Sequence, residues 1–186
     1  MPLGEKMSKE KTLSSQLIYD GNILQLYRDD VELEDGKTSK REYVRHSGGA
    51  CVLAVDDEEN IFLVSQFRYP YGAETIEIPA GKREKGEDPF VCAVRELEEE
   101  TGLVAEKYEL MASVYPTPAY TDEILYLYLA TGLTKKTAHL DEGEFLGVIK
   151  VPFEKAYQMA LSGEIHDSKT LVAIYAYAAK KARKEL

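Results

Sequence analysis

Apolar and polar residues alternate along the N-terminal part of the chain, with the period of β-strands that expose one face. Strands are predicted at residues 15–20 and 23–33, separated by the turn sequence DGN. The dipeptide DG at residues 35–36 then lies between two alternating runs, a pattern typical of a β-hairpin. The N-terminal region, residues 1–45, is therefore expected to form antiparallel strands.

From residue 46 onward, further strand-like runs surround one helical pattern, and two more helical patterns end the chain. Strands are predicted at 50–55, 61–69, 74–79, 108–116, 124–133 and 145–151, and helices at 89–101, 152–163 and 167–186. No internal repeat and no long linker divides this region. The order predicts an α+β or α/β fold with a mixed sheet and C-terminal helices, in one domain over residues 46–186.

The helical pattern at residues 89–101 has clear ends. Asp88 is a good N-cap, the proline after it is tolerated at the first helical position, and Gly102 suits the C-terminal stop. Apolar or small residues recur at helical spacing and are expected to face the core: Phe90, Ala93, Val94, Leu97 and Thr101.

A second face of the same helix carries three glutamates, Glu96, Glu99 and Glu100. Like charges three and four residues apart oppose helix formation by about 0.2–0.5 kcal/mol per pair. Negative charge near a helix C-terminus also opposes the helix dipole. Two interpretations stay open at this point. The glutamates form a solvated acidic face, or they bind a divalent cation such as Mg²⁺ together with phosphate oxygens.

Composition and charge narrow the class of protein. The chain has 186 residues, of which 44% are apolar and 30% charged, as is ordinary for a globular protein with a substantial core. Its net charge of −10 argues against a binder of nucleic-acid backbones. No stretch approaches the roughly 20 apolar residues that cross a bilayer, and the charged start lacks a signal core. Cys51 and Cys92 lie in apolar surroundings and indicate reduced thiols. We expect a cytoplasmic protein that binds neither membranes nor nucleic acid.

The sequence GKREKGEDPFVCAVRELEEETGL, residues 81–103, resembles the Nudix box at every fixed position. The matching residues are Gly81, Glu87, Arg95, Glu96, Leu97, Glu99, Glu100, Gly102 and Leu103. The resemblance implies an α/β/α sandwich around a mixed central sheet, and hydrolysis of a nucleoside diphosphate linked to another group. It further implies that Glu96, Glu99 and Glu100 bind two or three Mg²⁺ ions, with Mn²⁺ as an alternative. Arg95 would orient the glutamates, and both Arg95 and Glu99 would serve catalysis.

The residues that flank the box are similar to those of ADP-ribose pyrophosphatases. The sequence EIPAG leads into the box, and the resemblance implies that the carbonyl of Ala80 also binds metal. Pro118 follows Leu103 at the offset of a proline in that subfamily. The later sequence DEGEFLGV resembles the subfamily's acidic loop, in which Glu142 would be the catalytic base and Glu144 a further metal ligand. These two roles are interchangeable, and a solvated turn is the alternative.

Two arginines are candidates for binding the substrate. Arg45 and Arg68 would each contact a phosphate or stack on adenine, or would instead pair with a surface glutamate. Tyr27 and Tyr43 would stack on the base or pack within the strands. Because dimeric relatives build the base pocket across the subunit interface, we expect a homodimer in which residues 1–45 contribute to dimerisation and to the substrate site.

The resemblance predicts Mg²⁺-dependent hydrolysis of the pyrophosphate bond of ADP-ribose, which yields AMP and ribose 5-phosphate. One alternative is hydrolysis of another nucleotide sugar, such as GDP-mannose, or of a dinucleotide polyphosphate. Another is a sensor that binds a nucleotide sugar without cleaving it. A sensor would be free to lose the glutamates at positions 96, 99 and 100, and this chain keeps all three.

Overall fold

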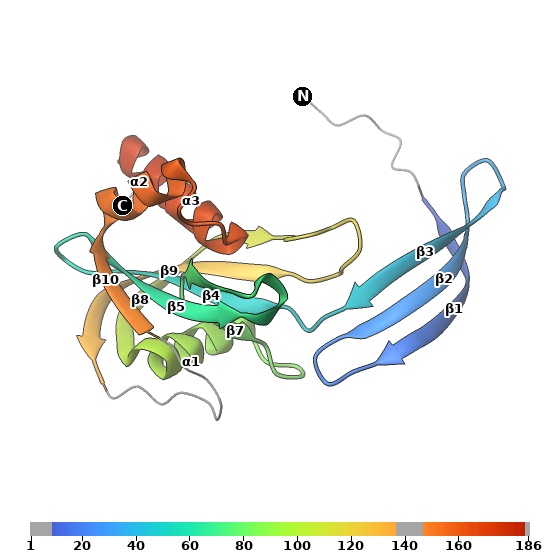
Figure 1. Cartoon of the computed structure of the whole chain (residues 1–186), viewed down its shortest axis with the longest axis horizontal. Coiled ribbons are helices and arrows are strands. Elements are labelled where there is room, and N and C mark those ends of the chain that lie inside the picture. Colours follow the sequence, from blue (N-terminus) through green and yellow to red (C-terminus); the bar gives the residue numbers. More distant parts are fainter. Residues whose placement is uncertain (1–8, 137–146, 185–186) are drawn as a thin grey trace. The chain divides into compact units, whose positions relative to one another are not determined.

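The computed structural model describes residues 9–136 and 147–184 (Figure 1). Backbone contacts divide the chain into two compact units. The first comprises the residues up to His46 together with Thr117–Glu123, and the second comprises Ser47–Pro116 and the chain from Ile124 onward.

The first unit is a three-stranded antiparallel sheet in the order β1-β2-β3. Its strands are β1 (Lys11–Asp20), β2 (Gln25–Glu32) and β3 (Thr38–Arg45). Strand β1 begins earlier than predicted, because the polar residues from Lys11 onward pair with β2 although they show no apolar alternation.

A distant segment completes the first unit. Val44 donates its N–H to the carbonyl oxygen of Tyr120 at 2.8 Å and accepts at its own carbonyl from Asp122 N–H at 3.2 Å. The Asp122 carboxylate also accepts from the N–H of His46 at 2.9 Å. The sequence did not indicate that the segment containing Pro118 would join the end of β3, since the two are far apart in the chain.

The second unit contains a mixed sheet in the order β10-β5-β4-β9-β8, with β6 paired to β5 and β7 to β4. Strands β4 and β9 are parallel and the remaining pairs are antiparallel, which confirms the predicted mixed sheet. In chain order its elements are β4 (Gly49–Val55), β5 (Asn60–Arg68), the 3₁₀ turn η1 (Tyr69–Tyr71), β6 (Ala73–Glu77), β7 (Ala80–Lys82), α1 (Pro89–Thr101), β8 (Leu103–Val114), β9 (Leu125–Lys135), β10 (Gly147–Pro152), α2 (Phe153–Ser162) and α3 (Ser168–Arg183).

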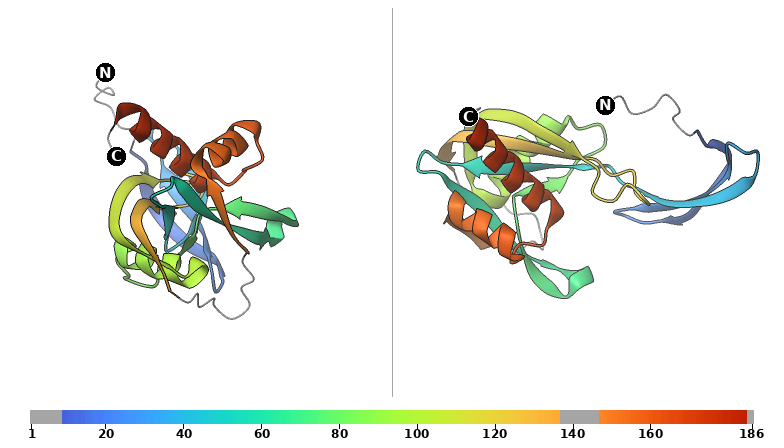
Figure 2. Two further views of the ribbon diagram at one scale, coloured as in Figure 1. Left: turned by 90° about the vertical axis from the view of Figure 1, so that its left-hand side faces the viewer. Right: turned by 90° about the horizontal axis from the view of Figure 1, so that it is seen from above.

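Helices cover both faces of this sheet, with α1 on one side and α2 and α3 on the other (Figure 2). The residues of strand β4 explain why both faces are covered. Every residue in it is buried, and alternate side chains enter two separate apolar clusters. Cys51 and Leu53 pack toward α2 and α3, whereas Ala50 and Val52 pack toward α1. The predicted α/β/α sandwich is confirmed. No helix in the described ranges is long and apolar enough to cross a membrane.

Helix α1 has the ends that the sequence predicted. The Asp88 carboxylate accepts from the N–H of Phe90 at 2.8 Å, and Gly102 adopts the left-handed conformation with φ of 65°. The predicted core stripe is wrong at its first position, because Phe90 is 46% exposed and lies edge-on to Tyr108 and Tyr128. The residues of α1 that are buried are Cys92, Ala93, Glu96, Leu97 and Glu100.

Candidate metal-binding and hydrolytic site

Strand β7 and helix α1 meet at a very close approach. A Cβ atom added to Gly81 would overlap the carboxylate of Glu96. The backbone of Gly81 does not have a positive φ, so glycine is required here for space rather than for conformation. The first residue of the box therefore makes room for one of its glutamates.

Two of the three glutamates on this face of α1, Glu96 and Glu100, are buried, which rules out a simple solvated acidic face. Glu96 is 8% exposed and Glu100 is 4% exposed. Glu100 accepts a hydrogen bond at Oε2 from the N–H of Ala80 at 3.0 Å. The side chain of Glu99 is more open, at 31% exposure. A chain that buries carboxylates side by side stabilises them with specific partners.

Arg95 is the main partner of these carboxylates. Its Nη1 lies 2.6 Å from Glu96 Oε1 and 2.8 Å from Glu99 Oε2, and its Nε lies 3.1 Å from Glu87 Oε1. The hydrogen bond to Glu87 raises the pKa of the Arg95 guanidinium and lowers the pKa of the Glu87 carboxyl. Arg95 thus holds the two helix glutamates and the loop glutamate together, and its role in catalysis stays a prediction.

The loop before α1 is itself fixed, which holds Glu87 in place. Glu87 Oε2 accepts from the N–H of Glu84 at 2.9 Å, and the Glu87 carbonyl oxygen accepts from Arg83 Nε at 3.0 Å. Arg83 also lies over the ring of Tyr126. These contacts of Arg83 were not predicted, and only its position within residues 81–103 could have suggested them.

The donors at this site fit a hard divalent cation. Carboxylate oxygens of Glu96, Glu99 and Glu100 and the backbone of Ala80 come together where β7 meets α1. Within residues 9–136 and 147–184, no three carboxylate, imidazole or thiol side chains are gathered closely enough to hold an ion by themselves. Carboxylate and carbonyl oxygens are nevertheless the kind of ligand that Mg²⁺ takes in proteins.

A thiol nucleophile does not fit this site. Burial, together with the charges of Glu87 and Glu96, raises the pKa of the Cys92 thiol to about 12. The thiolate, which is the reactive form, is therefore essentially absent at neutral pH. Cys51 and Cys92 are both buried and are not joined in a disulfide. Water remains the expected attacking group.

Arg68, at the end of β5, forms an ion pair with Glu77. Its Nε and Nη2 donate to the two Glu77 carboxylate oxygens at 2.7 Å and 2.6 Å. Glu77 also accepts from Lys169. Burial acts to raise the pKa of Glu77, but Arg68 and Lys169 outweigh it and hold that pKa at about 2. The structure thus shows Arg68 paired with a glutamate, and its contact with substrate stays a prediction.

Arg45, Tyr27 and Tyr43 form one group on the sheet of the first unit. The two tyrosine rings are stacked, with centroids 5.6 Å apart, and the Arg45 guanidinium lies 4.6 Å from the centroid of Tyr27. All three residues were predicted as candidates from the sequence, but their contact with one another was not. The two rings meet because Tyr27 and Tyr43 are cross-strand partners. Pro118 belongs to the same unit. Glu142 and Glu144 lie outside the described residues.

Models of two protein families match this chain. The Nudix domain model matches residues 45–173. The chain belongs to the Nudix family. The model of the nucleoside diphosphate sugar hydrolase N-terminal domain matches residues 10–44, directly before the Nudix domain.

Relatives of this Nudix protein match it along nearly its whole length. An ADP-ribose pyrophosphatase of Bacillus subtilis (strain 168) is 45% identical over 179 residues, which cover 95% of this chain and 97% of that protein. A methanol dehydrogenase activator of Bacillus methanolicus is 47% identical over 171 residues, which cover 91% of this chain and 92% of that protein. The crystal structure of an ADP compounds hydrolase shares the fold, with a TM-score of 0.84 and 17% identity over 98% of this chain and 100% of that chain.

Proposed function

We propose that this Nudix protein hydrolyses the pyrophosphate bond of ADP-ribose to AMP and ribose 5-phosphate, with Mg²⁺ as cofactor. The observation that carries the proposal is the pair of buried carboxylates, Glu96 and Glu100, placed beside Gly81 and Ala80 and held by Arg95. The 45% identity to an ADP-ribose pyrophosphatase supports the choice of substrate.

Each residue of the site has a defined task in this proposal. Glu96, Glu99, Glu100 and the carbonyl of Ala80 would hold two or three Mg²⁺ ions, or Mn²⁺ in their place. When bound, such ions neutralise phosphate charge and lower the pKa of a bound water. Arg95 fixes the positions of the Glu96 and Glu99 carboxylates through the ion pairs at 2.6 and 2.8 Å, so that they would need little rearrangement to bind a cation.

Glu142 and Glu144 complete the proposed machinery. Glu142 would accept the proton of the attacking water, and Glu144 would be a further metal ligand, with the two roles interchangeable. Their support is the resemblance of DEGEFLGV to the acidic loop of ADP-ribose pyrophosphatases.

The proposed substrate contacts are made by Arg45, Arg68 and Pro118. Arg45, beside the stacked rings of Tyr27 and Tyr43, offers a cationic and aromatic surface suited to a nucleotide base. Arg68 would contact a phosphate, and Pro118 would frame the terminal ribose.

We place this enzyme in the cytoplasm as a homodimer, in which residues 1–45 contribute to the interface and to the partner's substrate site. Light scattering tests the dimer, and the mass of one chain, 20.9 kDa, would contradict it.

The substrate is tested by comparing kcat/KM for ADP-ribose, ADP-glucose, GDP-mannose and nucleoside triphosphates. Because specificity arises from contacts made in the transition state, it should appear in kcat/KM rather than in binding alone. The proposal expects ADP-ribose to be preferred. If GDP-mannose or a triphosphate is hydrolysed more efficiently, the protein is a Nudix hydrolase of another substrate.

The 47% identity to a methanol dehydrogenase activator supports a second candidate function, activation of a methanol dehydrogenase. Adding the purified protein to a methanol dehydrogenase and following its rate tests this directly. If the dehydrogenase rate increases with the wild type but not with Glu100→Gln, activation depends on the same site as hydrolysis. If the rate does not increase, activation of the dehydrogenase is excluded.

A further inference from the structure

Ile78 and Pro79 carry the chain from β6 to β7, where it leaves strand β5 and joins strand β4. Both residues are fully buried. Because Ile78 lies between the two ladders, its N–H donates to a side chain rather than to a strand. The acceptor is Thr170 Oγ1 at 2.8 Å, which lies 92 positions away in the first turn of α3. Thr170 is itself fully buried.

The next two residues are held by two other elements. The carbonyl oxygen of Pro79 accepts from the N–H of Val52 in β4 at 2.8 Å. The N–H of Ala80 donates to Glu100 in α1 at 3.0 Å. Proline fixes its own φ and confines the preceding residue to extended conformations. A displacement at Ile78 is therefore transmitted to Ala80 instead of being absorbed by backbone rotation.

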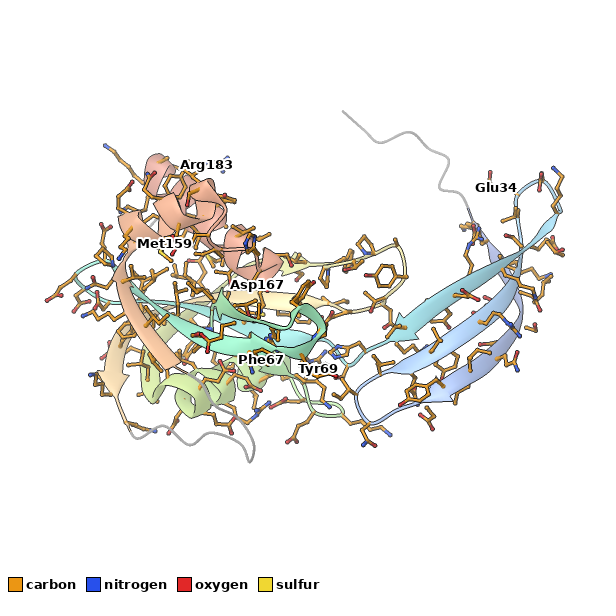
Figure 3. All side chains as sticks on the ribbon, viewed as in Figure 1. Glu34, Phe67, Tyr69, Met159, Asp167 and Arg183 are labelled. Carbon is orange, nitrogen blue, oxygen red and sulfur yellow. The ribbon has the colours of Figure 1, made fainter. Side chains whose placement is uncertain are left out.

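The Thr170 hydroxyl is oriented by its own helix. It donates to Asp167 Oδ2 at 2.6 Å, and the same oxygen accepts from the N–H of Thr170 at 3.0 Å. Asp167 is the N-cap at the start of α3 (Figure 3). Lys169 donates to Asp167 Oδ1 at 3.0 Å and also to Glu77. The first turn of α3 thus holds two successive residues, Glu77 and Ile78, at the end of β6.

We propose that Thr170 is a positioning residue of the metal site, because its hydroxyl fixes Ile78 and, through Pro79, sets Ala80 against Glu100. The inference rests on the proposed function, in which Ala80 and the α1 glutamates bind the cation. A side chain of α3 thereby acts on a site formed by α1 and β7 without touching the ion or the substrate.

The test replaces Thr170 by valine, which keeps the shape but offers no acceptor to the buried N–H of Ile78. Binding of Mn²⁺ to the substrate-free protein is measured by titration calorimetry. We expect Thr170→Val to weaken it by about 10- to 100-fold, the usual effect of losing a group that holds a metal ligand. Thr170→Ser retains the hydroxyl and should bind Mn²⁺ like the wild type.

Ile174→Val is the matched control, because Ile174 is fully buried one turn further along α3 and its side chain has no polar group. It should lower stability while leaving Mn²⁺ affinity unchanged. If Thr170→Val does not fold, Thr170→Ala is measured in its place with the same expectation.

Three outcomes overturn the inference. Unchanged Mn²⁺ affinity in the hydroxyl-free variant, or an equal loss in Thr170→Ser, contradicts the positioning role and leaves the proposed function standing. If the wild type binds no Mn²⁺, the proposed metal site is wrong and the inference falls with it. The two failures are therefore told apart by the wild-type titration.

Discussion

The substitution Glu100→Gln removes one negative charge from the buried side chain that contacts Ala80 and changes little else. In the wild type the N–H of Ala80 donates to Glu100 Oε2 at 3.0 Å. The glutamine amide has nearly the shape of the carboxylate, so its oxygen can accept the same hydrogen bond. The backbone of β7 and the packing of α1 are therefore expected to persist. What is lost is one negative charge and part of the capacity to bind a cation.

The size of the effect follows from the burial of the site. Glu100 is 4% exposed, so bulk water and salt screen its charge only weakly. Removing one preorganised charged group from a reaction centre typically lowers kcat by about a hundredfold or more, which corresponds to about 2.7 kcal/mol of the barrier. We expect a loss of at least this size in turnover, with stability in metal-free buffer equal to or above that of the wild type.

Glu98→Gln is the matched control on the same helix. Glu98 is one-third exposed and pairs with Lys136 at 3.1 Å, away from the glutamates that face β7. It loses the same charge, so its turnover should stay near that of the wild type. Initial rates of ADP-ribose hydrolysis at saturating Mg²⁺ decide the matter. Equal turnover of Glu100→Gln and the wild type would show that the charge of Glu100 does not serve the reaction.

Two further predictions concern the neighbouring residues. Gly81→Ala should lower turnover by about a hundredfold with the fold retained, because the added methyl group displaces the Glu96 carboxylate; normal Mg²⁺-dependent rates would contradict this. The Glu77 ion pairs should contribute about 3 kcal/mol to stability above pH 4.5, since the pKa of Glu77 falls from 4.5 to about 2 on folding. That contribution is lost as the pH falls from 4.5 through 2, so urea unfolding should separate Glu77→Gln from the wild type at pH 7 and much less at pH 3.

Local rules account for what the sequence predicted well. The N-cap Asp88 and the stop at Gly102 bound α1 as expected, because both act on backbone groups a few positions away. The spacing of the glutamates placed them on one helical face. The continuous apolar run at residues 50–55 predicted a strand, and β4 forms there with every residue buried.

Contacts between distant residues account for what the sequence did not predict. The spacing could not show that Glu96 and Glu100 are buried, because their burial depends on β7 passing directly over the helix at Gly81. The link from Thr170 to Ile78 joins residues 92 positions apart and has no periodic signal. The pairing of Val44 with the segment around Tyr120 is equally non-local.

If Glu96, Glu99 and Glu100 serve a cation-dependent hydrolysis of ADP-ribose, removal of the metal must abolish the reaction. AMP release from ADP-ribose is measured with Mg²⁺, after addition of EDTA, and after Mg²⁺ is restored in excess. We expect AMP release to stop with EDTA and to return with Mg²⁺. AMP release that continues unchanged in EDTA, or that fails to occur with Mg²⁺, would contradict it.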